Sequence, residues 1–392
     1  MTLLIASAKI MLAAGLIAGL TGQINTAAPV KLVNAKITDT PHRWSNYISL
    51  DAYSKPFWKA DTIVDESVQV MRNGDRFTAT LLFKPKRILS VSVANHSRLL
   101  MKGKDWDFKN GRLVFGATST VPYFRSSDLL FDKEVPGHSM NGSTPGIYVL
   151  FGEGSFFASK QIEVTYIKNK ADNWMGPVPV FAATKLPKTI AKLKHKENLE
   201  VVFYGNSIEV GYNASGLEKA PPFMPVWPEI VIFNLKQHYG APVTYDNPSI
   251  AGKLAKWGED SVAVRVIPKK PDLVIIGFGM NDGTAKLPPE IYRTHIKGII
   301  DSVSRQNPAT EFILIAPMLA NPASAFSGNQ TLYKAELDKL ARTGAVVADL
   351  TGVHTELLKH KSYQDMTGNN VNHPNDYLAR WYAQIICGLL IK

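Results

Sequence analysis

The chain has 392 residues, of which 45% are hydrophobic and 20% are charged. This balance favours a globular protein with a sizeable buried core, and the length favours two domains. The net charge of +11 is spread along the chain, without the basic helix interleaved with aromatic side chains that is typical of nucleic-acid binding. No nucleic-acid partner is therefore expected, and the charge indicates either solubility or attraction to an acidic polymer.

The N-terminal stretch has the pattern of a secretory signal. Lys9 precedes an apolar run at residues 10–20, and polar residues follow from Thr21 onward. This run is short for a membrane span, and no later stretch is long and apolar enough to cross a bilayer. The single cysteine, Cys387, excludes an intrachain disulfide. We therefore predict a signal peptide at residues 1–28 and an exported bacterial protein, periplasmic or extracellular, with no stable membrane span after signal removal.

Residues 29–175 are predicted to form an all-β domain. Runs with strand character occur at residues 77–83, 88–93 and 161–167, and Asn-Gly turn signals punctuate the region. Several short strands with such spacing suggest a sandwich of the jelly-roll type. Tryptophans in this half can stack on sugar rings, although core or interface packing is the more common use of such side chains.

Residues 176–187 are rich in proline and are interpreted as a linker, because the pattern changes after them to alternating helices and strands in residues 188–392. The expected strands cover residues 199–204, 242–245, 272–277, 311–316 and 345–350, and the expected helices cover residues 186–196, 227–239, 259–267, 289–305, 331–342 and 376–390. Continuous apolar strands separated by helices indicate a parallel sheet covered on both faces, which is a three-layer α/β sandwich. Ligands are then expected at the carboxyl ends of the strands.

Four loops at those strand ends carry the candidate site residues. Ser207 follows the strand at residues 199–204 in a sharp Gly-Asn-Ser turn, where α/β folds place nucleophiles. A serine needs a base at neutral pH, and His373 is the histidine best placed in a strand-end loop. The backbone N–H groups of Ser207 and Gly252 and the side-chain amide of Asn281 can donate to a developing oxyanion. Each residue alone has an ordinary use in a turn or cap, but together they predict acyl transfer without a metal or cofactor.

The four loops resemble the blocks of the SGNH hydrolases, the GDSL-like esterase superfamily, with Ser207, Gly252, Asn281 and His373 at the four named positions. The resemblance covers about residues 186–392, and Gly-Met-Asn-Asp and Asn-His-Pro are its most specific parts. It implies a flavodoxin-like SGNH domain. The preceding β-rich half is similar in architecture to the N-terminal jelly rolls of carbohydrate esterase family two. The resemblance thus implies an exported serine esterase that removes acetyl groups from a carbohydrate or polysaccharide through an acyl-enzyme.

Two positions depart from the family pattern. Asn206 stands where most members have aspartate, and Asn370 stands where the family usually has an aspartate, three residues before His373. Asparagine can accept a hydrogen bond from the ring but cannot stabilise the imidazolium by charge. Several groups could accept from the second ring nitrogen of the histidine: Asn370, Asp365, Asp376 or a backbone carbonyl. We favour the backbone carbonyl, which would make the site a Ser–His dyad; a degenerate site that only binds is the remaining alternative.

Two other functions fit the same residues. A lipase or thioesterase of the same fold would use the same nucleophile, although no amphipathic lid-like insertion is apparent. A catalytically impaired carbohydrate-binding protein is suggested by Asn206 and Asn370. The glycan, the acyl position and the oligomeric state are not specified by the sequence.

Overall fold

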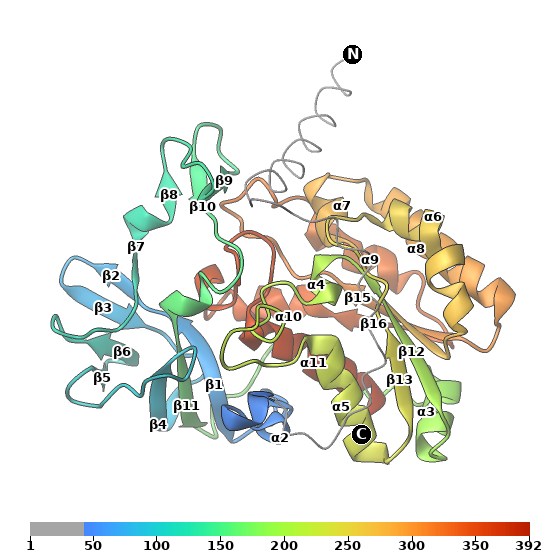
Figure 1. Cartoon of the computed structure of the whole chain (residues 1–392), viewed down its shortest axis with the longest axis horizontal. Coiled ribbons are helices and arrows are strands. Elements are labelled where there is room, and N and C mark those ends of the chain that lie inside the picture. The colour runs from blue at the N-terminus through green and yellow to red at the C-terminus, as the bar shows by residue number, and fades with distance from the viewer. Residues whose placement is uncertain (1–42) are drawn as a thin grey trace. The chain divides into compact units, whose positions relative to one another are not determined.

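The computed structural model describes residues 43–392, which pack as one compact unit (Figure 1). The predicted signal peptide at residues 1–28 lies outside this part of the chain. Within the described part, no helix combines the length and apolar character that crossing a bilayer requires.

The C-terminal half is built on a five-stranded parallel sheet with the strand order β13-β12-β14-β15-β16. The strands are β12 (Leu199–Gly205), β13 (Val243–Asp246), β14 (Leu273–Gly277), β15 (Glu311–Ala316) and β16 (Ala345–Asp349). In chain order this arrangement is 2-1-3-4-5, the order of flavodoxin-like folds. The predicted flavodoxin-like parallel sheet is therefore confirmed, and the carboxyl ends of all five strands lie along one edge.

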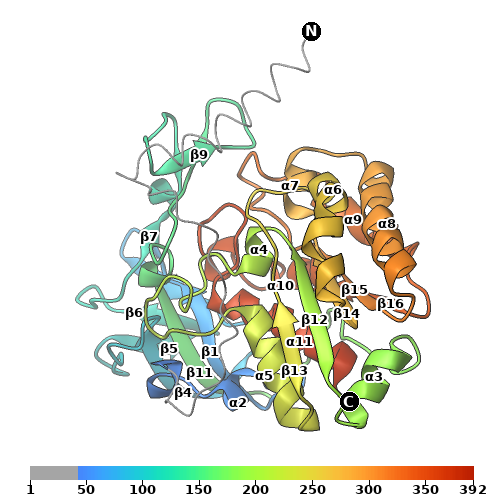
Figure 2. The same ribbon diagram turned by 45° about the vertical axis from the view of Figure 1, so that its right-hand side comes forward.

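Helices cover both faces of this sheet (Figure 2). They are α3 (Pro187–Lys194), α5 (Trp227–Tyr239), α6 (Ala255–Arg265), α8 (Pro289–Gln306), α9 (Tyr333–Asp338), α10 (Leu350–Leu357) and α11 (Asp376–Leu390). Successive residues of β12 point to opposite faces. Val201 and Phe203 join the core formed with α5 and α11, whereas Val202 and Tyr204 join the core formed with α6 and α8. The continuous apolar run of β12 is thus explained by burial on both sides.

Most predicted elements of this half agree with the structure, and α5, β15 and α11 have the predicted bounds. Helix α6 begins four residues earlier than predicted, at Ala255, because the Asp282 carboxylate accepts a hydrogen bond from its backbone N–H at 2.8 Å. That cap comes from a distant segment and has no local signal. Two short helices that directly follow β12 and β14 were not predicted, α4 (Ser207–Val210) and α7 (Met280–Thr284).

The N-terminal half of the described chain is β-rich, as predicted, but the jelly roll is not confirmed. It contains α2 (Leu50–Tyr53) and the strands β1 (Thr62–Gln69), β2 (Met71–Asn73), β3 (Arg76–Ala79), β4 (Pro85–Val93), β5 (Trp106–Lys109), β6 (Arg112–Phe115), β7 (Phe124–Arg125), β8 (Leu130–Phe131), β9 (Ser139–Asn141), β10 (Tyr148–Leu150) and β11 (Gln161–Lys168). These strands form separate small sheets in the orders β1-β11-β4, β5-β6-β3-β2-β7 and β8-β10-β9. Several have only two to four residues, which is short for the strands of a two-sheet sandwich.

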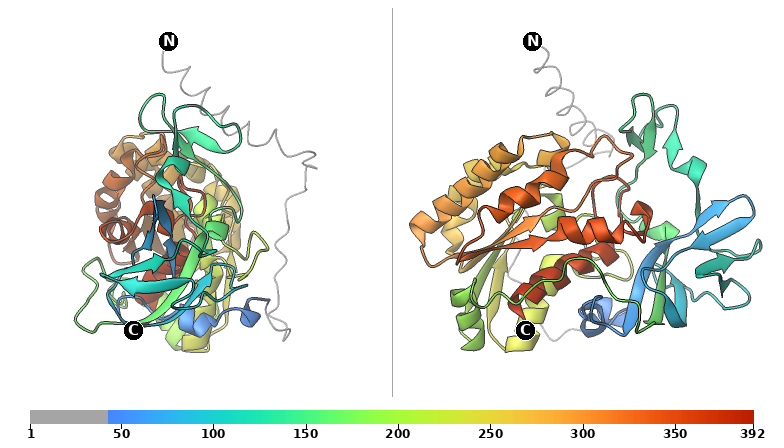
Figure 3. Two further views of the ribbon diagram at one scale, coloured as in Figure 1. Left: turned by 90° about the vertical axis from the view of Figure 1, so that its left-hand side faces the viewer. Right: turned by 180° about the vertical axis from the view of Figure 1, so that it is seen from behind.

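The β-rich part, which holds β1 to β11, packs directly against the α/β part, which holds β12 to β16, as the right-hand view of Figure 3 shows. Lys361 Nζ lies 2.5 Å from Glu66 Oε1 of β1, and both side chains are fully buried. Arg380 of α11 donates to the carbonyl of Val64, also in β1, at 2.8 Å. One apolar core includes residues from both parts. The predicted boundary at residues 176–187 marks a change in secondary structure and stays a prediction as a domain boundary.

Candidate active site

The turn between β12 and α4 positions Ser207. Asn206 caps α4, since its side-chain oxygen accepts a hydrogen bond from Ile208 N at 3.0 Å. Its Nδ2 atom donates to the carbonyl of Gly277, at the end of the neighbouring strand β14, at 3.1 Å. Asn206 therefore holds Ser207 at the carboxyl edge of the sheet, and its amide group makes a contact that a carboxylate could not make.

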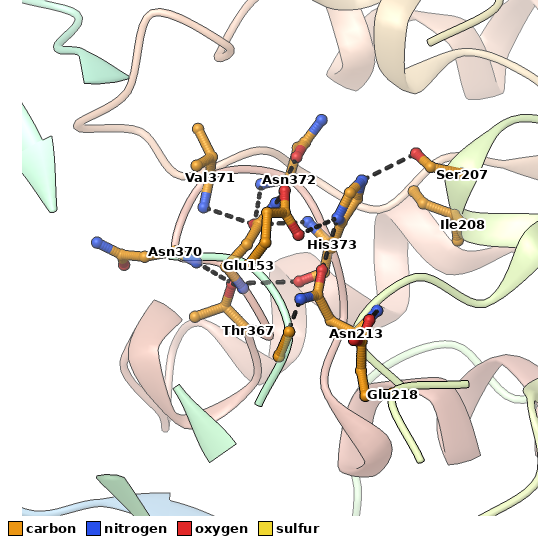
Figure 4. Close-up of polar contacts among 12 residues, drawn as sticks. Glu153, Ser207, Ile208, Asn213, Glu218, Thr367, Asn370, Val371, Asn372 and His373 are labelled. Carbon is orange, nitrogen blue, oxygen red and sulfur yellow. Dashed lines mark hydrogen bonds and ion pairs between the residues drawn. The ribbon is translucent and has the colours of Figure 1, made fainter. Parts of the chain in front are cut away.

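His373 lies against Ser207, with Nε2 2.8 Å from the serine Oγ (Figure 4). Both residues are buried, with 6% and 4% of their surface exposed. This distance is within the range that direct proton transfer between a serine and a base requires. The structure thus brings together the serine and the histidine that the sequence predicted as a pair.

The loop before α11 fixes His373. The side-chain oxygen of Asn369 accepts hydrogen bonds from the backbone N–H groups of Val371, Asn372 and His373 at 3.0–3.1 Å. Thr367 Oγ1 is 3.1 Å from the carbonyl oxygen of His373 and donates to it. These hydrogen bonds within the loop fix its backbone, so that the imidazole of His373 faces Ser207.

Asn213 is the partner of the second ring nitrogen. Its Oδ1 atom lies 2.7 Å from His373 Nδ1, while its Nδ2 atom donates to the carbonyl of Gly154 at 3.0 Å. The second bond assigns the orientation of the amide, so that its oxygen faces the ring. Nδ1 must then carry the proton, and Nε2 presents its lone pair to the Ser207 hydroxyl.

Asn370, one of the candidates for orienting the ring, does not contact it. Its side chain points away from His373 (Figure 4), and its Nδ2 atom donates to the carbonyl of Leu150 at 2.9 Å. Its Oδ1 atom accepts from Gln364 Nε2 at 2.8 Å. Asn370 adopts a left-handed φ of +65°, which asparagine tolerates, and this turn directs its side chain to the β-rich part.

The two predicted aspartates do not reach the ring either. Asp365 accepts from the backbone N–H of Gln69 at 2.6 Å, across the contact with the β-rich part. Asp376 accepts from the backbone N–H of Ser215 at 2.9 Å, and burial raises its pKa to about 6. Both carboxylates are engaged in structural contacts, and the acceptor at Nδ1 is a side-chain amide rather than the backbone carbonyl of a dyad.

Glu153 is a second group beside Nδ1. It follows β10 in the β-rich part, and its Oε2 atom lies 3.6 Å from the ring nitrogen. Its Oε1 atom accepts from Asn369 Nδ2 at 3.3 Å. Burial raises the pKa of the Glu153 carboxyl, but the adjacent His373 ring and the amides of Asn369 and Asn213 together hold this pKa below its usual range. A carboxylate therefore faces the histidine from the β-rich part.

Gly252 lies in the loop between β13 and α6, and Asn281 lies in the first turn of α7, which follows β14. Gly252 has a left-handed φ of +77°, and an added Cβ would meet no atom within 4 Å, so this side of the loop is open. Asn281 Nδ2 donates one hydrogen to the carbonyl of Lys253 at 3.0 Å, which leaves the second amide hydrogen for another acceptor. The arrangement is compatible with the predicted oxyanion donors, whose role stays a prediction.

The geometry and the sequence of these loops agree with one family of ester hydrolases. The α/β part matches the GDSL-like Lipase/Acylhydrolase family over residues 203–380. The match spans Ser207, Gly252, Asn281 and His373. It confirms the predicted resemblance to SGNH hydrolases over this part of the chain.

The individual proteins to which this chain is similar share only a small part of their sequence with it. An arylesterase of Vibrio mimicus is 28% identical over 104 residues, which cover 26% of this chain and 48% of that protein, so the chain spans about half the length of this relative. A two-domain esterase (CEX) active on acetylated mannans has 23% identity and a TM-score of 0.43, with 54% of each chain covered. Axe2, an acetylxylan esterase from Geobacillus stearothermophilus, has 18% identity and a TM-score of 0.40, with coverage of 48% of this chain and 92% of that one.

The sequence analysis missed Asn213 and Glu153. Asn213 follows the nucleophile turn in a Gly-Tyr-Asn segment, and only its left-handed φ of +64° marks it as unusual. Glu153 lies in a different half of the chain, between Gly152 and Gly154. No spacing rule connects Glu153 to His373, because the packing of the two halves brings them together.

Proposed function

We propose that the protein is an exported serine esterase that removes acetyl or other short acyl groups from a carbohydrate or polysaccharide. The observation that carries the proposal is the continuous hydrogen-bonded series from Ser207 Oγ through the His373 ring to Asn213 Oδ1, at 2.8 and 2.7 Å. The pattern of residues 10–20 supports export. The carbohydrate substrate is supported by the sequence resemblance to SGNH carbohydrate esterases and by the presence of a β-rich part ahead of the α/β part.

The proposed reaction has two halves. Ser207 Oγ attacks the acyl carbon while its proton passes to His373 Nε2. The oxyanion is stabilised by the N–H groups of Ser207 and Gly252 and by the Asn281 amide. His373 then gives the proton to the departing sugar oxygen, and the C–O bond to the sugar breaks. In the second half water gives a proton to His373 Nε2 and attacks the acyl carbon. His373 then returns the proton to Ser207 Oγ as the acyl C–Oγ bond breaks, which releases the carboxylic acid and the free serine.

Asn213 has a defined part in this cycle. By accepting a hydrogen bond from the Nδ1–H group of His373, it keeps Nε2 unprotonated and directed at Ser207 before the attack. This observation also weakens the reading of the site as catalytically impaired. Asn206 and Asn370 motivated that reading, and both have structural contacts that do not compete with the Ser207–His373 pair.

Hydrolysis of an aryl acetate by the purified protein tests the proposal. We expect Ser207→Ala to lower kcat by at least about 10³-fold, because the residual rate would come only from binding and oxyanion stabilisation. Ser97→Ala, a change of an exposed serine in the β-rich part, is the matched control and should be fully active. Full activity of the folded Ser207→Ala variant would refute the serine mechanism.

A panel of substrates separates the alternatives. Faster hydrolysis of acetylated polysaccharides and acetyl esters than of long-chain acyl esters or thioesters is expected. The reverse preference would support a lipase or thioesterase. Measurable polysaccharide affinity without hydrolysis of any ester would support a binding protein instead.

A further inference from the structure

We propose that Glu153 is the charged positioning residue of His373, so that the two tasks of a triad aspartate are divided between two side chains. Asn213 fixes the tautomer and direction of the ring, and Glu153, from the β-rich part, stabilises the positive charge that the ring acquires. This inference rests on the proposed function, in which His373 takes up a proton during catalysis.

The geometry around Nδ1 supports the division. Asn213 Oδ1 makes the short contact at 2.7 Å, and Glu153 Oε2 approaches the same nitrogen at 3.6 Å from another direction (Figure 4). A neutral amide orients the ring but adds no net charge. A carboxylate at this distance favours the imidazolium over the neutral ring. The two side chains therefore supply together what neither supplies alone.

Glu153 is held in place by the catalytic loop itself. Asn369, which binds the backbone N–H of His373, also donates to Glu153 Oε1 at 3.3 Å. The next residue, Gly154, accepts the hydrogen bond from Asn213 Nδ2. One dipeptide of the β-rich part thus contacts both the loop that carries the ring and the amide that orients it, so the site is incomplete without this part.

The other titratable groups near the ring are engaged differently. The Tyr212 ring meets the imidazole edge-on, with centroids 5.7 Å apart. Glu218 accepts from the backbone N–H of Asn213 at 3.3 Å, and Asp376 accepts from Ser215. In the described part of the chain, Glu153 is the one carboxylate within 4 Å of a His373 ring nitrogen.

The exposure of Glu153 limits the size of its effect. Its side chain is 41% exposed, so water and salt screen the interaction with the ring. Removing the charge of Glu153 should therefore lower the catalytic rate far less than the ~10⁴-fold that follows the removal of a buried triad carboxylate. This decrease should also depend on ionic strength.

The test compares Glu153→Gln with the wild type across pH. Glutamine keeps an oxygen that can accept from Asn369 and removes only the charge. We expect kcat/KM on an aryl acetate to fall about tenfold at low salt, which corresponds to a weak, partly screened charge interaction. The acidic limb of its pH profile should move to lower pH, because the ring takes up a proton less readily without the carboxylate.

Three comparisons make the result specific. Glu134→Gln removes the same charge from an exposed position of the β-rich part and should leave rate and profile unchanged. Glu153→Asp, which keeps the charge, should recover part of the lost rate. One molar NaCl should slow the wild type more than Glu153→Gln. An acidic limb at the wild-type pH in Glu153→Gln would overturn the proposal, whatever the rate, because a merely structural role would not move it.

A second measurement does not depend on activity. With histidines labelled selectively with ¹⁵N, the titration of His373 can be followed by NMR in Ser207→Ala and in Ser207→Ala/Glu153→Gln. We expect the midpoint to lie at lower pH in the double variant, and equal midpoints would overturn the inference. If the midpoint shifts but the wild-type protein hydrolyses no ester, the proposed function is refuted and the Glu153–His373 coupling is still established.

Discussion

Asn213 Oδ1 and Ser207 Oγ contact opposite nitrogens of the same imidazole, at 2.7 and 2.8 Å from His373. Both side chains come from the segment that follows β12. Helix α4 ends at Gly211, whose φ of +94° is in the left-handed region, and the chain then turns so that Asn213 faces the ring. A single segment thus supplies both the group that the histidine is to deprotonate and the group that orients the histidine.

Replacement of Asn213 by alanine should impair catalysis without unfolding the protein. The ring would lose the acceptor that keeps the proton on Nδ1, and we expect kcat to fall by about 10²-fold. Steady-state kinetics on an aryl acetate, with a thermal melt for each variant, measures both effects. Asn234→Ala, which removes an amide bonded to the Ile230 carbonyl in α5, is the matched control. An unchanged kcat in Asn213→Ala would show that the ring needs no acceptor there.

Asn206→Asp should destabilise the turn at neutral pH. The buried Nδ2 atom donates to the Gly277 carbonyl, and a carboxylate would place an oxygen against that carbonyl instead. We expect a loss of about 1–3 kcal/mol in the free energy of unfolding. The loss should be smaller at acidic pH, where a protonated carboxyl can donate. Urea denaturation at pH 5 and pH 7.5 measures both values, and a pH-independent loss would contradict this explanation.

Asn281→Ala tests the oxyanion assignment. If the free amide hydrogen stabilises the transition state, kcat should fall by about 10²–10³-fold with little change in KM. The bond to the Lys253 carbonyl is lost as well, so a thermal melt is needed to separate stability from rate. A raised KM with an unchanged kcat would assign Asn281 to substrate binding instead.

The pH dependence of stability should depend on Glu209 in the nucleophile turn. Burial raises the pKa of its carboxyl to about 8, partly opposed by the hydrogen bond from Asn206 N. Its oxygens fill the space beside Gly205 and Gly277, where an added Cβ would approach them to 2.2 and 2.1 Å.

The pKa of Glu209 in the folded protein lies above the ordinary value of 4.5. The contribution of its protonated carboxyl to stability is therefore complete below about pH 4.5 and is lost as the pH rises to about 8. Each pH unit within that window costs at most about 1.4 kcal/mol. Glu209→Gln stays neutral, so its stability relative to the wild type should increase from pH 5 to pH 8 in urea denaturation. A constant difference between the two proteins over this window would contradict the burial of an ionisable carboxyl.

The sequence determined the α/β part in most respects. Strands such as β12 and β14 are continuous apolar runs because both faces are buried, and helices with apolar periodicity separate them, so the parallel sheet follows from local pattern. Since the carboxyl ends of parallel strands lie at one edge, the order of the loops alone brought Ser207 and His373 together as candidates. Three strand runs of the β-rich part were predicted, near β3, β4 and β11, but most of its short strands and their arrangement were not, because they depend on pairings between distant short segments.

Only the tertiary structure decided which groups contact Nδ1 of His373. The sequence pointed to Asn370, Asp365 and Asp376 because they are near in the chain, but a left-handed turn directs Asn370 away, and the two aspartates bind backbone N–H groups. The groups that do reach Nδ1, Asn213 and Glu153, lie 160 and 220 residues away in sequence. The local sequence pattern determines the secondary structure and the edge of the sheet where a site forms. The direction of a single side chain depends instead on packing between segments that are distant in the sequence.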